Sequence, residues 1–292
     1  MTTDHNTLLR TAFDAYLVQL DCDGLEPSES YLPYDFEQIR YHLWRTLGAE
    51  MVVDELREMT NILNRWLKAL RRWGAWNKVI SEYGEKDAWD IRSEFFEALV
   101  HQCLLQPSAT RDALTFVVTN SMHQVRLMLG NGYFDHLEGD PVTHDQRPIN
   151  LTRRGKEKRL SDLIKPWPEA EQFMTALHKV DDKPYREATS DYRNRSSHAI
   201  GPRLAIGTTR TVVRSVEPST EFTRKDDGTY ERTRVAGRMS VCYAFGGTEP
   251  LDMVKIFAIN LKQFRCARAC YESYRGLLSA GIDEVPNVRP AS

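Results

Sequence analysis

The 292-residue chain has no long apolar run and few cysteines, and each absence excludes a class of protein. No segment approaches the roughly 18 consecutive apolar residues of a membrane-spanning helix, so the sequence predicts none. The first residues have neither the basic nor the apolar region of a secretory signal, so we expect no such signal. The cysteines are an odd, dispersed set, which favours free, buried thiols in a reducing cytoplasm over a disulfide framework. They are Cys22, Cys103, Cys242, Cys266 and Cys270.

The common sequence fingerprints of nucleotide and metal chemistry are absent as well. The chain has no Walker-type phosphate loop, no Rossmann glycine pattern, no Gly-x-Ser-x-Gly elbow and no His-Glu-x-x-His. Cys266 and Cys270 stand four residues apart, but no second pair of Cys or His has ligand spacing, which favours packing over zinc. The sequence therefore predicts neither a metal site nor a cofactor.

The composition is that of an ordinary globular protein, with 41% hydrophobic and 27% charged residues. The net charge of −2 conceals an uneven distribution along the chain. Residues 1–150 hold 14 Lys and Arg against 23 Asp and Glu, whereas residues 151–214 hold 14 against 8. A polyanionic ligand would favour this middle segment, although a solvated basic surface explains the same excess.

The periodicity of apolar residues predicts a mainly α protein, a helical bundle with a small β-hairpin or meander before the last helix. Pro107 and Ser108 form a stop and N-cap signal between two helices, and residues 130–165 lose periodicity and form a long connection. Strands are expected at 209–216 and 229–245, with the turn at Asp226-Asp227-Gly228. The expected helices are 8–20, 34–47, 51–76, 87–105, 111–129, 168–180, 184–200 and 250–279. The last of them should bury Val254, Phe257, Leu261, Phe264, Tyr271, Tyr274 and Leu278.

These patterns divide the chain into three parts. Residues 1–84 are expected to form an N-terminal helical region that packs on the core. Residues 85–280 form the helical bundle with its β insert at about 204–247, and residues 281–292 form a tail.

One short stretch carries residue types suited to acid–base chemistry on a phosphate. Arg193, Asn194 and His198 lie in the helix predicted over 184–200. At about 100° per residue, Asn194 and His198 are neighbours, whereas Arg193 lies about 140° around the helix from His198. A histidine titrates near neutrality and can take a proton from a ribose 2′-hydroxyl or give one to a leaving oxygen, while a guanidinium fits a phosphate. A solvated helix face without any such role is the alternative interpretation.

Arg193-Asn194-x3-His198 resembles the signature of the HEPN superfamily (higher eukaryotes and prokaryotes nucleotide-binding domain), Arg-x4–6-His with a polar residue often behind the arginine. The resemblance implies a helical-bundle core, a homodimer whose two motifs face each other, and metal-independent ribonuclease activity, often in toxins or defence effectors. Arg193 and His198 match the catalytic pair, and Asn194 matches the polar position. Candidate supporting residues are Glu187, which weakly matches an upstream acidic position, Tyr192 and Ser197.

The resemblance covers one helix and, by architecture, residues 85–280. The insert at 204–247 and the extra N-terminal helical region depart from the minimal pattern of four or five helices, which leaves the substrate open.

Three hypotheses remain. The first is a cytoplasmic, homodimeric, metal-independent endoribonuclease of HEPN type, a toxin or phage-defence effector with an antitoxin as a candidate partner. The second is a non-catalytic RNA- or nucleotide-binding module of a toxin–antitoxin-like system, and the third is a helical interaction protein. The residues expected to contact an RNA backbone are Arg153, Arg154, Lys156, Lys158, Arg159 and Arg195.

Overall fold

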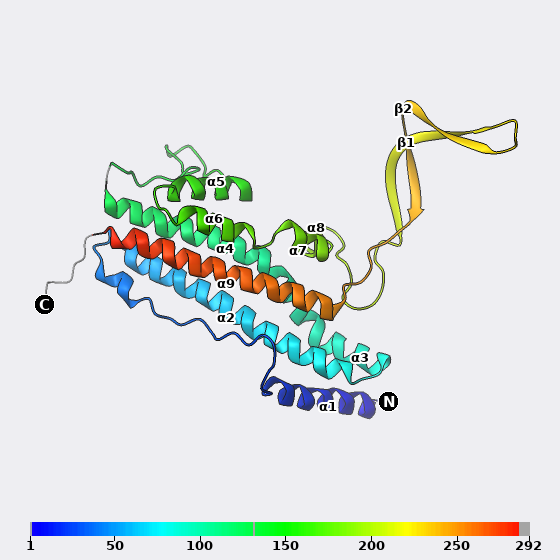
Figure 1. Cartoon of the computed structure of the whole chain (residues 1–292), viewed down its shortest axis with the longest axis horizontal. Helices are drawn as coiled ribbons and strands as arrows, with labels where there is room; N and C mark the ends of the chain where they lie inside the picture. Colours follow the sequence, from blue (N-terminus) through cyan, green and yellow to red (C-terminus); the bar gives the residue numbers. More distant parts are fainter. Residues whose placement is uncertain (1, 131, 286–292) are drawn as a thin grey trace. The chain divides into compact units, whose positions relative to one another are not determined.

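Helices dominate the computed structural model, which describes residues 2–130 and 132–285 (Figure 1). The predicted fold class is confirmed, because the chain is mainly helical and its antiparallel hairpin precedes the last helix. None of the described helices is both long and apolar enough to cross a membrane. The elements are α1 (Thr2–Leu20), the 3₁₀ helix η1 (Glu37–Tyr41), α2 (Gly48–Ser81), α3 (Glu85–Ile91), the π-helical η2 (Arg92–Phe96), α4 (Glu97–Leu129), α5 (Arg153–Ile164), α6 (Ala170–His178), α7 (Lys183–Ala188), α8 (Tyr192–His198), β1 (Val212–Arg224), β2 (Tyr230–Phe245) and α9 (Met253–Asp283).

The chain divides into two compact units. The larger unit comprises residues 1–188 and 253–292, and the smaller unit comprises residues 189–252 with α8 and the hairpin. The division drawn from the sequence, with boundaries after residues 84 and 280, stays a prediction. Part of the predicted tail, residues 286–292, lies outside the described residues.

Three long helices, α2, α4 and α9, run side by side and form the core of the larger unit (Figure 1). They have 34, 33 and 31 residues, which corresponds to about 50 Å at 1.5 Å per residue. Aromatic side chains fill the space between them. Trp66 of α2 meets Phe264 of α9 edge to face, with 5.5 Å between ring centroids, and Trp73 meets Phe257 at 5.6 Å. Burial of these apolar stripes, rather than local helix propensity, holds the bundle together.

The last helix extends close to its predicted bounds, and most of its predicted inner stripe is confirmed. Phe257 is half-buried, and Leu261, Phe264, Tyr271, Tyr274 and Leu278 are buried. The predicted burial of Val254 is wrong, because its side chain is 65% exposed. Met253 and Ile256 occupy the inward positions of the first turn, which rotates Val254 towards solvent.

The helix break expected at Pro107 does not occur, because α4 continues across this residue. Proline lacks the N–H that would bond the carbonyl of Cys103 four residues earlier. The side-chain amide of Asn260 on α9 donates to that carbonyl at 3.0 Å. The hydroxyl of Tyr185 donates to the next carbonyl, that of Leu104, also at 3.0 Å. Neighbouring elements thus satisfy the carbonyls beside the proline, and the helix persists.

The helix predicted over 34–47 is wrong apart from the short η1. Its neighbouring segment, residues 22–36, runs without regular structure and is held by side chains of α2 and α9. Asn64 on α2 bonds both backbone groups of Leu32, accepting from its N–H at 2.8 Å and donating to its carbonyl at 3.0 Å. These tertiary bonds satisfy backbone groups of a segment that forms no helix of its own. Four arginines add further bonds: Arg71 to the carbonyls of Pro27 and Glu29, Arg265 to the carboxylates of Glu26 and Glu29, Arg268 to the carbonyl of Ser30, and Arg275 to Asp35.

The long connection expected at 130–165 is only partly correct, since its last third forms α5. Thr152 caps this helix, because its hydroxyl accepts from the backbone N–H of Gly155 at 3.3 Å. The dense charge of the segment hides a short apolar stripe of Leu160, Leu163 and Ile164, all buried. The following helix predicted over 168–180 is confirmed as α6.

The predicted hairpin is confirmed, and its first strand is longer than expected. Gly228 in the turn has φ +84°, a conformation that glycine adopts without strain. The carboxylate of Asp227 accepts from the backbone N–H and the hydroxyl of Thr229, at 2.9 and 2.6 Å. The register shifts between Pro218 and Thr220, which divides the hairpin into an inner and an outer part.

Candidate functional site

The residues of the Arg-His motif lie on α8, a helix of seven residues. The single helix predicted over 184–200 is wrong, because α7 ends at Ala188 and α8 begins at Tyr192. Ser190 and Asp191 between them have φ 51° and 52°, which belongs to the left-handed region and cannot continue an α-helix. Ser and Asp side chains compete with the backbone for hydrogen bonds, which makes this a favourable place for a break.

The three motif side chains of α8 are exposed to solvent. Asn194 donates to the carboxylate of Asp191 at 3.1 Å, which holds the amide at the start of the helix. Arg193 and His198 have no side-chain hydrogen bond or ion pair within residues 2–130 and 132–285. They are five positions apart, so they point about 140° apart around α8 and do not converge within one chain. Asn194 and His198, four residues apart, remain neighbours.

The candidate supporting residues have different environments. Tyr192 is buried at the start of α8, whereas Ser197 is exposed. Glu187 lies on α7 and pairs with Lys183 at 3.5 Å. The break after α7 means that helix periodicity no longer relates Glu187 to His198.

The basic run 153–159 does not form a continuous row of free cations. Arg153 is bound to the carboxylates of Asp112 at 2.7 Å and Asp181 at 2.6 Å. Burial alone would lower the pKa of Arg153, but its hydrogen bonds with the two aspartates raise it above the ordinary value. Arg159 donates to the carbonyl of Glu138 at 2.7 Å. The basic side chains left exposed on α5 are Arg154, Lys156 and Lys158, while Arg195 on α8 is half-buried.

These contacts show a structural role that the sequence did not reveal. Arg111 on α4 forms a bidentate ion pair with Glu157 on α5, with N–O distances of 2.7 and 2.9 Å. Both side chains are about nine-tenths buried. Together with Arg153, this pair fastens α5 to α4. Two of the five basic residues in the run, Arg153 and Arg159, therefore bind groups of the fold.

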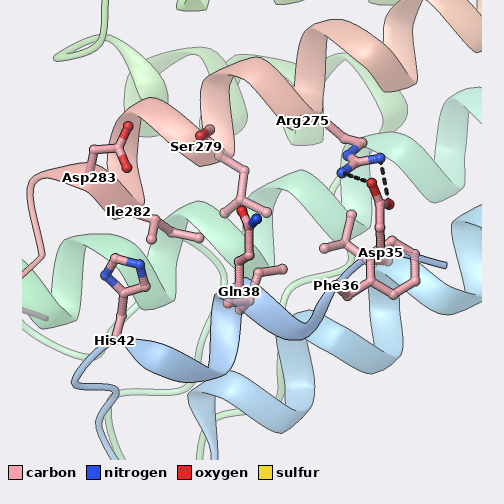
Figure 2. Close-up of a pocket in the computed structure, with 11 residues that line it drawn as sticks. Asp35, Phe36, Gln38, His42, Arg275, Ser279, Ile282 and Asp283 are labelled. Atoms are coloured by element: carbon pink, nitrogen blue, oxygen red, sulfur yellow. Dashed lines mark hydrogen bonds and ion pairs between the residues drawn. The ribbon is translucent and has the colours of Figure 1, made fainter. Parts of the chain in front are cut away.

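A small pocket opens between η1 and α9 in the larger unit (Figure 2). At one end the guanidinium of Arg275 pairs with Asp35 at 2.9 Å, and their hydrogen bond lowers the pKa of Asp35. Figure 2 shows His42 and Asp283 at the other end. The cavity volume is about 110 Å³, well below the few hundred Å³ of pockets for drug-sized ligands. Such a space suits a few water molecules and cannot enclose a nucleotide.

Polar side chains also meet within the helical core. Burial raises the pKa of Glu55 on α2 to about 7, although Asn120 of α4 donates to it at 2.5 Å. Hydroxyl pairs join Thr60 to Tyr271 at 2.8 Å and Ser121 to Tyr274 at 2.7 Å. These bonds connect all three long helices.

A second polar cluster surrounds the buried His123 on α4. Its two ring nitrogens lie 2.7 Å from the hydroxyl of Tyr133 and 2.8 Å from a carboxylate oxygen of Asp135. Arg126 covers the Tyr133 ring, 4.4 Å from its centroid. These contacts fasten the segment after α4 to the helix. Sequence reasoning missed the cluster, because His123 follows the spacing of a core position and its partners come from an irregular segment.

Within the part of the chain that the structure describes, no three His, Cys, Asp or Glu side chains gather closely enough to hold a metal ion. Comparisons with protein-family models, curated proteins and solved structures find no significant match to this chain. A functional assignment for α8 therefore depends on the chemistry of its own residues.

Proposed function

We propose that this chain is a metal-independent endoribonuclease of HEPN type, with its active site built around Arg193 and His198. The observation that carries the proposal is the exposure of both side chains on α8, without a competing partner among the described residues. A histidine and an arginine that face solvent can reach a polymeric substrate, which the 110 Å³ pocket cannot enclose.

The proposed reaction is an internal displacement at phosphorus. The imidazole of His198 takes the proton of a ribose 2′-hydroxyl, and the 2′-oxygen forms a bond to phosphorus as the bond to the 5′-oxygen breaks. The imidazolium of His198 formed in this way then gives its proton to the leaving 5′-oxygen, so the products are a 2′,3′-cyclic phosphate and a 5′-hydroxyl. The guanidinium of Arg193 stabilises the charge on the phosphate oxygens in the transition state. Asn194, tethered to Asp191, orients the imidazole next to it.

The proposal includes a homodimer, which the geometry of α8 supports. Arg193 and His198 point about 140° apart, so one chain cannot aim both at one phosphate. Two copies related by a twofold axis can pair the arginine of one chain with the histidine of the other. In this proposal the protein acts as a toxin or defence effector, with an antitoxin as its partner and Arg154, Lys156, Lys158 and Arg195 as contacts to the RNA backbone.

The second candidate is a non-catalytic RNA- or nucleotide-binding module. The observation that favours it is the same divergence of Arg193 and His198 within one chain. A monomer would keep the cationic surface of α5 without a paired acid–base site.

A cleavage assay separates the two candidates. Purified full-length chain is incubated with end-labelled single-stranded and structured RNA in EDTA. The proposal predicts cyclic-phosphate products with the wild type and a loss of at least about 100-fold in rate for His198→Ala, the usual range for a general acid–base residue. His144→Ala, at a side chain that is 92% exposed, is the matched control and should keep full activity. Cleavage that survives His198→Ala unchanged overturns this mechanism, and RNA binding without any product favours the second candidate.

A further inference from the structure

The outer part of the hairpin segregates its side chains by charge. Beyond the register shift, Phe222 pairs with Arg232, Arg224 with Tyr230 and Thr220 with Arg234. Directly paired residues, and every second residue along a strand, lie on the same face of a sheet. One face therefore carries Thr220, Phe222, Arg224, Tyr230, Arg232 and Arg234, which we call the Arg-aromatic face. The opposite face carries Glu221, Thr223, Glu231 and Thr233.

The Arg-aromatic face holds three arginines and no acidic residue. Arg224 and Arg234 have no side-chain partner within the described ranges, and Arg232 uses its Nε to donate to the hydroxyl of Thr220 at 3.2 Å. The nearest ion pair, Lys225 with Glu231 at 3.3 Å, involves the acidic side of the sheet. The positive charge of this face is therefore available to an anion.

Two aromatic rings lie among these arginines and are open to water. Phe222 is 65% exposed and Tyr230 is 66% exposed. Each ring stands directly opposite a guanidinium across the two strands, Phe222 opposite Arg232 and Tyr230 opposite Arg224. Exposed rings that alternate with guanidinium groups suit a polyanion that also carries flat, unpaired rings. Single-stranded nucleic acid has this chemistry, whereas a duplex hides the faces of its bases.

We propose that the Arg-aromatic face binds single-stranded RNA, with bases stacked on Phe222 and Tyr230 and phosphates bound by Arg224, Arg232 and Arg234. The choice of RNA as the polymer rests on the proposed ribonuclease function, since α8 and the hairpin belong to the same unit, residues 189–252. The face supplies affinity for unpaired substrate strands, and the motif of α8 supplies the chemistry.

Fluorescence anisotropy with labelled oligouridine tests this binding. The protein is full-length His198→Ala in EDTA, so that the probe stays intact. Phe222→Ile with Tyr230→Ile removes both rings but keeps apolar residues that favour strands. Affinity should fall at least about fivefold for each ring removed. Phe222→Trp, which keeps an aromatic ring at this position, should bind as tightly as the parent protein. Val241→Ala in the inner hairpin, where the side chain is 48% exposed, is the matched control.

The arginines are tested by the salt dependence of the same binding. Arg224→Gln, Arg232→Gln and Arg234→Gln together remove three phosphate contacts. The slope of log affinity against log salt should then become shallower by about 2, since each contact to a single strand contributes about 0.7. Arg214→Gln, at an exposed arginine of the inner hairpin, should change the slope by less than one contact.

The outcomes separate the two proposals. If neither the ring variants nor the arginine variants change the affinity, or if duplex RNA binds more tightly than oligouridine, the proposal that the Arg-aromatic face binds single-stranded RNA is overturned. Polyphosphate that binds as tightly as oligouridine, with no effect of the ring variants, overturns it in favour of simple charge attraction. RNA cleavage that is unchanged by the hairpin variants also overturns the platform, while the nuclease stands. Oligouridine binding that needs this face, without cleavage by the wild type, supports the platform and overturns the nuclease.

Discussion

Asn260 of α9 is completely buried, and its side chain bonds three other elements of the core. Its oxygen accepts from the indole N–H of Trp66 at 3.0 Å. Its amide donates to the carbonyl of Cys103, which Pro107 deprives of a helix partner, and lies 3.3 Å from the hydroxyl of Tyr185. A buried polar group without a partner costs more free energy than a hydrogen bond contributes, so this side chain offsets the bond that α4 loses at Pro107.

Asn260→Leu should lower the free energy of unfolding by about 3 kcal/mol, because it leaves the indole N–H of Trp66 and the carbonyl of Cys103 without a hydrogen-bond partner. Urea denaturation followed by circular dichroism measures the change. Pro107→Ala restores a backbone N–H for that carbonyl, so the loss caused by Asn260→Leu should be smaller by about 1 kcal/mol in this background. Equal losses in both backgrounds would show that Asn260 does not compensate for the proline.

At the scale of elements, the packing of irregular segments on the long helices depends on local shape as well as on charge. Gly74 lies inside α2, seven residues before its last residue Ser81, where helix propensity favours alanine. A Cβ at this position would lie 2.6 Å from the carbonyl oxygen of Glu26. The glycine therefore lets the N-terminal segment approach the helix backbone, which explains its place in an otherwise regular helix.

Gly74→Ala should destabilise the protein by about 1–3 kcal/mol, since the added methyl group pushes the segment around Glu26 away from α2. Gly276→Ala on α9 is the matched control, because nothing lies within 4 Å of its added Cβ. This control should stabilise the protein by about 0.5–1 kcal/mol through helix propensity alone. Thermal melts of the two variants should move in opposite directions from the wild type. A stabilising Gly74→Ala would contradict the close approach.

Glu55 gives the contact between α2 and α4 a dependence on pH. Burial raises its pKa from an ordinary 4.5 to about 7 in the fold. Between these values the unfolded chain loses the proton before the folded one does, so the free energy of unfolding falls as pH rises from about 4.5 to about 7. Below this window the carboxyl is neutral in both states and the penalty is absent.

Glu55→Gln should therefore remove part of this pH dependence. The variant and the wild type should melt at similar temperatures near pH 4, and the variant should melt at a higher temperature near pH 8. Glu58→Gln, on the exposed side of the same helix, controls for the loss of one negative charge. Melting curves at several pH values measure the difference in melting temperature between variant and wild type. If this difference does not grow between about pH 4.5 and pH 7, the pH dependence does not come from Glu55.

At the scale of the whole molecule, the proposed chemistry requires more than one chain. The two motif side chains diverge on α8, so a shared site requires a second copy. This requirement distinguishes a composite site from a motif that acts within one chain, and mixed variants reveal which arrangement is present.

Mixing Arg193→Ala chains with His198→Ala chains should restore ribonuclease activity. In a mixed dimer one site loses both residues, while the other keeps an intact arginine and an intact histidine from opposite chains. Random pairing at equal concentrations makes half of the dimers mixed, so activity should reach about a quarter of the wild-type value. Refolding or co-expression ensures exchange, and labelled RNA reports the rate. Each variant alone should stay inactive, and a mixture without activity would exclude the composite site.

How far the sequence could predict this molecule differs from one residue to the next. The spacing of Phe264 and its neighbours on α9 predicted that they lie in the core, because an apolar stripe leaves water by packing on other elements. The stop signal at Pro107 failed because Asn260, more than 150 residues away, supplies the missing bond. Likewise, the sequence predicted that Arg153 contacts RNA, whereas in the fold its guanidinium is paired with Asp112 and Asp181. Of the candidate site, the sequence identified the residues of α8, but not the break before the helix or the environment of the basic run.

The sequence by itself determined the helical class and the positions of α2, α9 and the hairpin, because periodicity and turn residues act over a few neighbouring positions. Only the tertiary structure decided which proline a helix tolerates, which basic side chains remain available, and which rings and arginines share one face of the outer hairpin. These outcomes depend on partners that are distant in the chain, and on a strand register that a shift between Pro218 and Thr220 resets. A shift in register changes which side chains meet across the two strands, and the local sequence does not fix it.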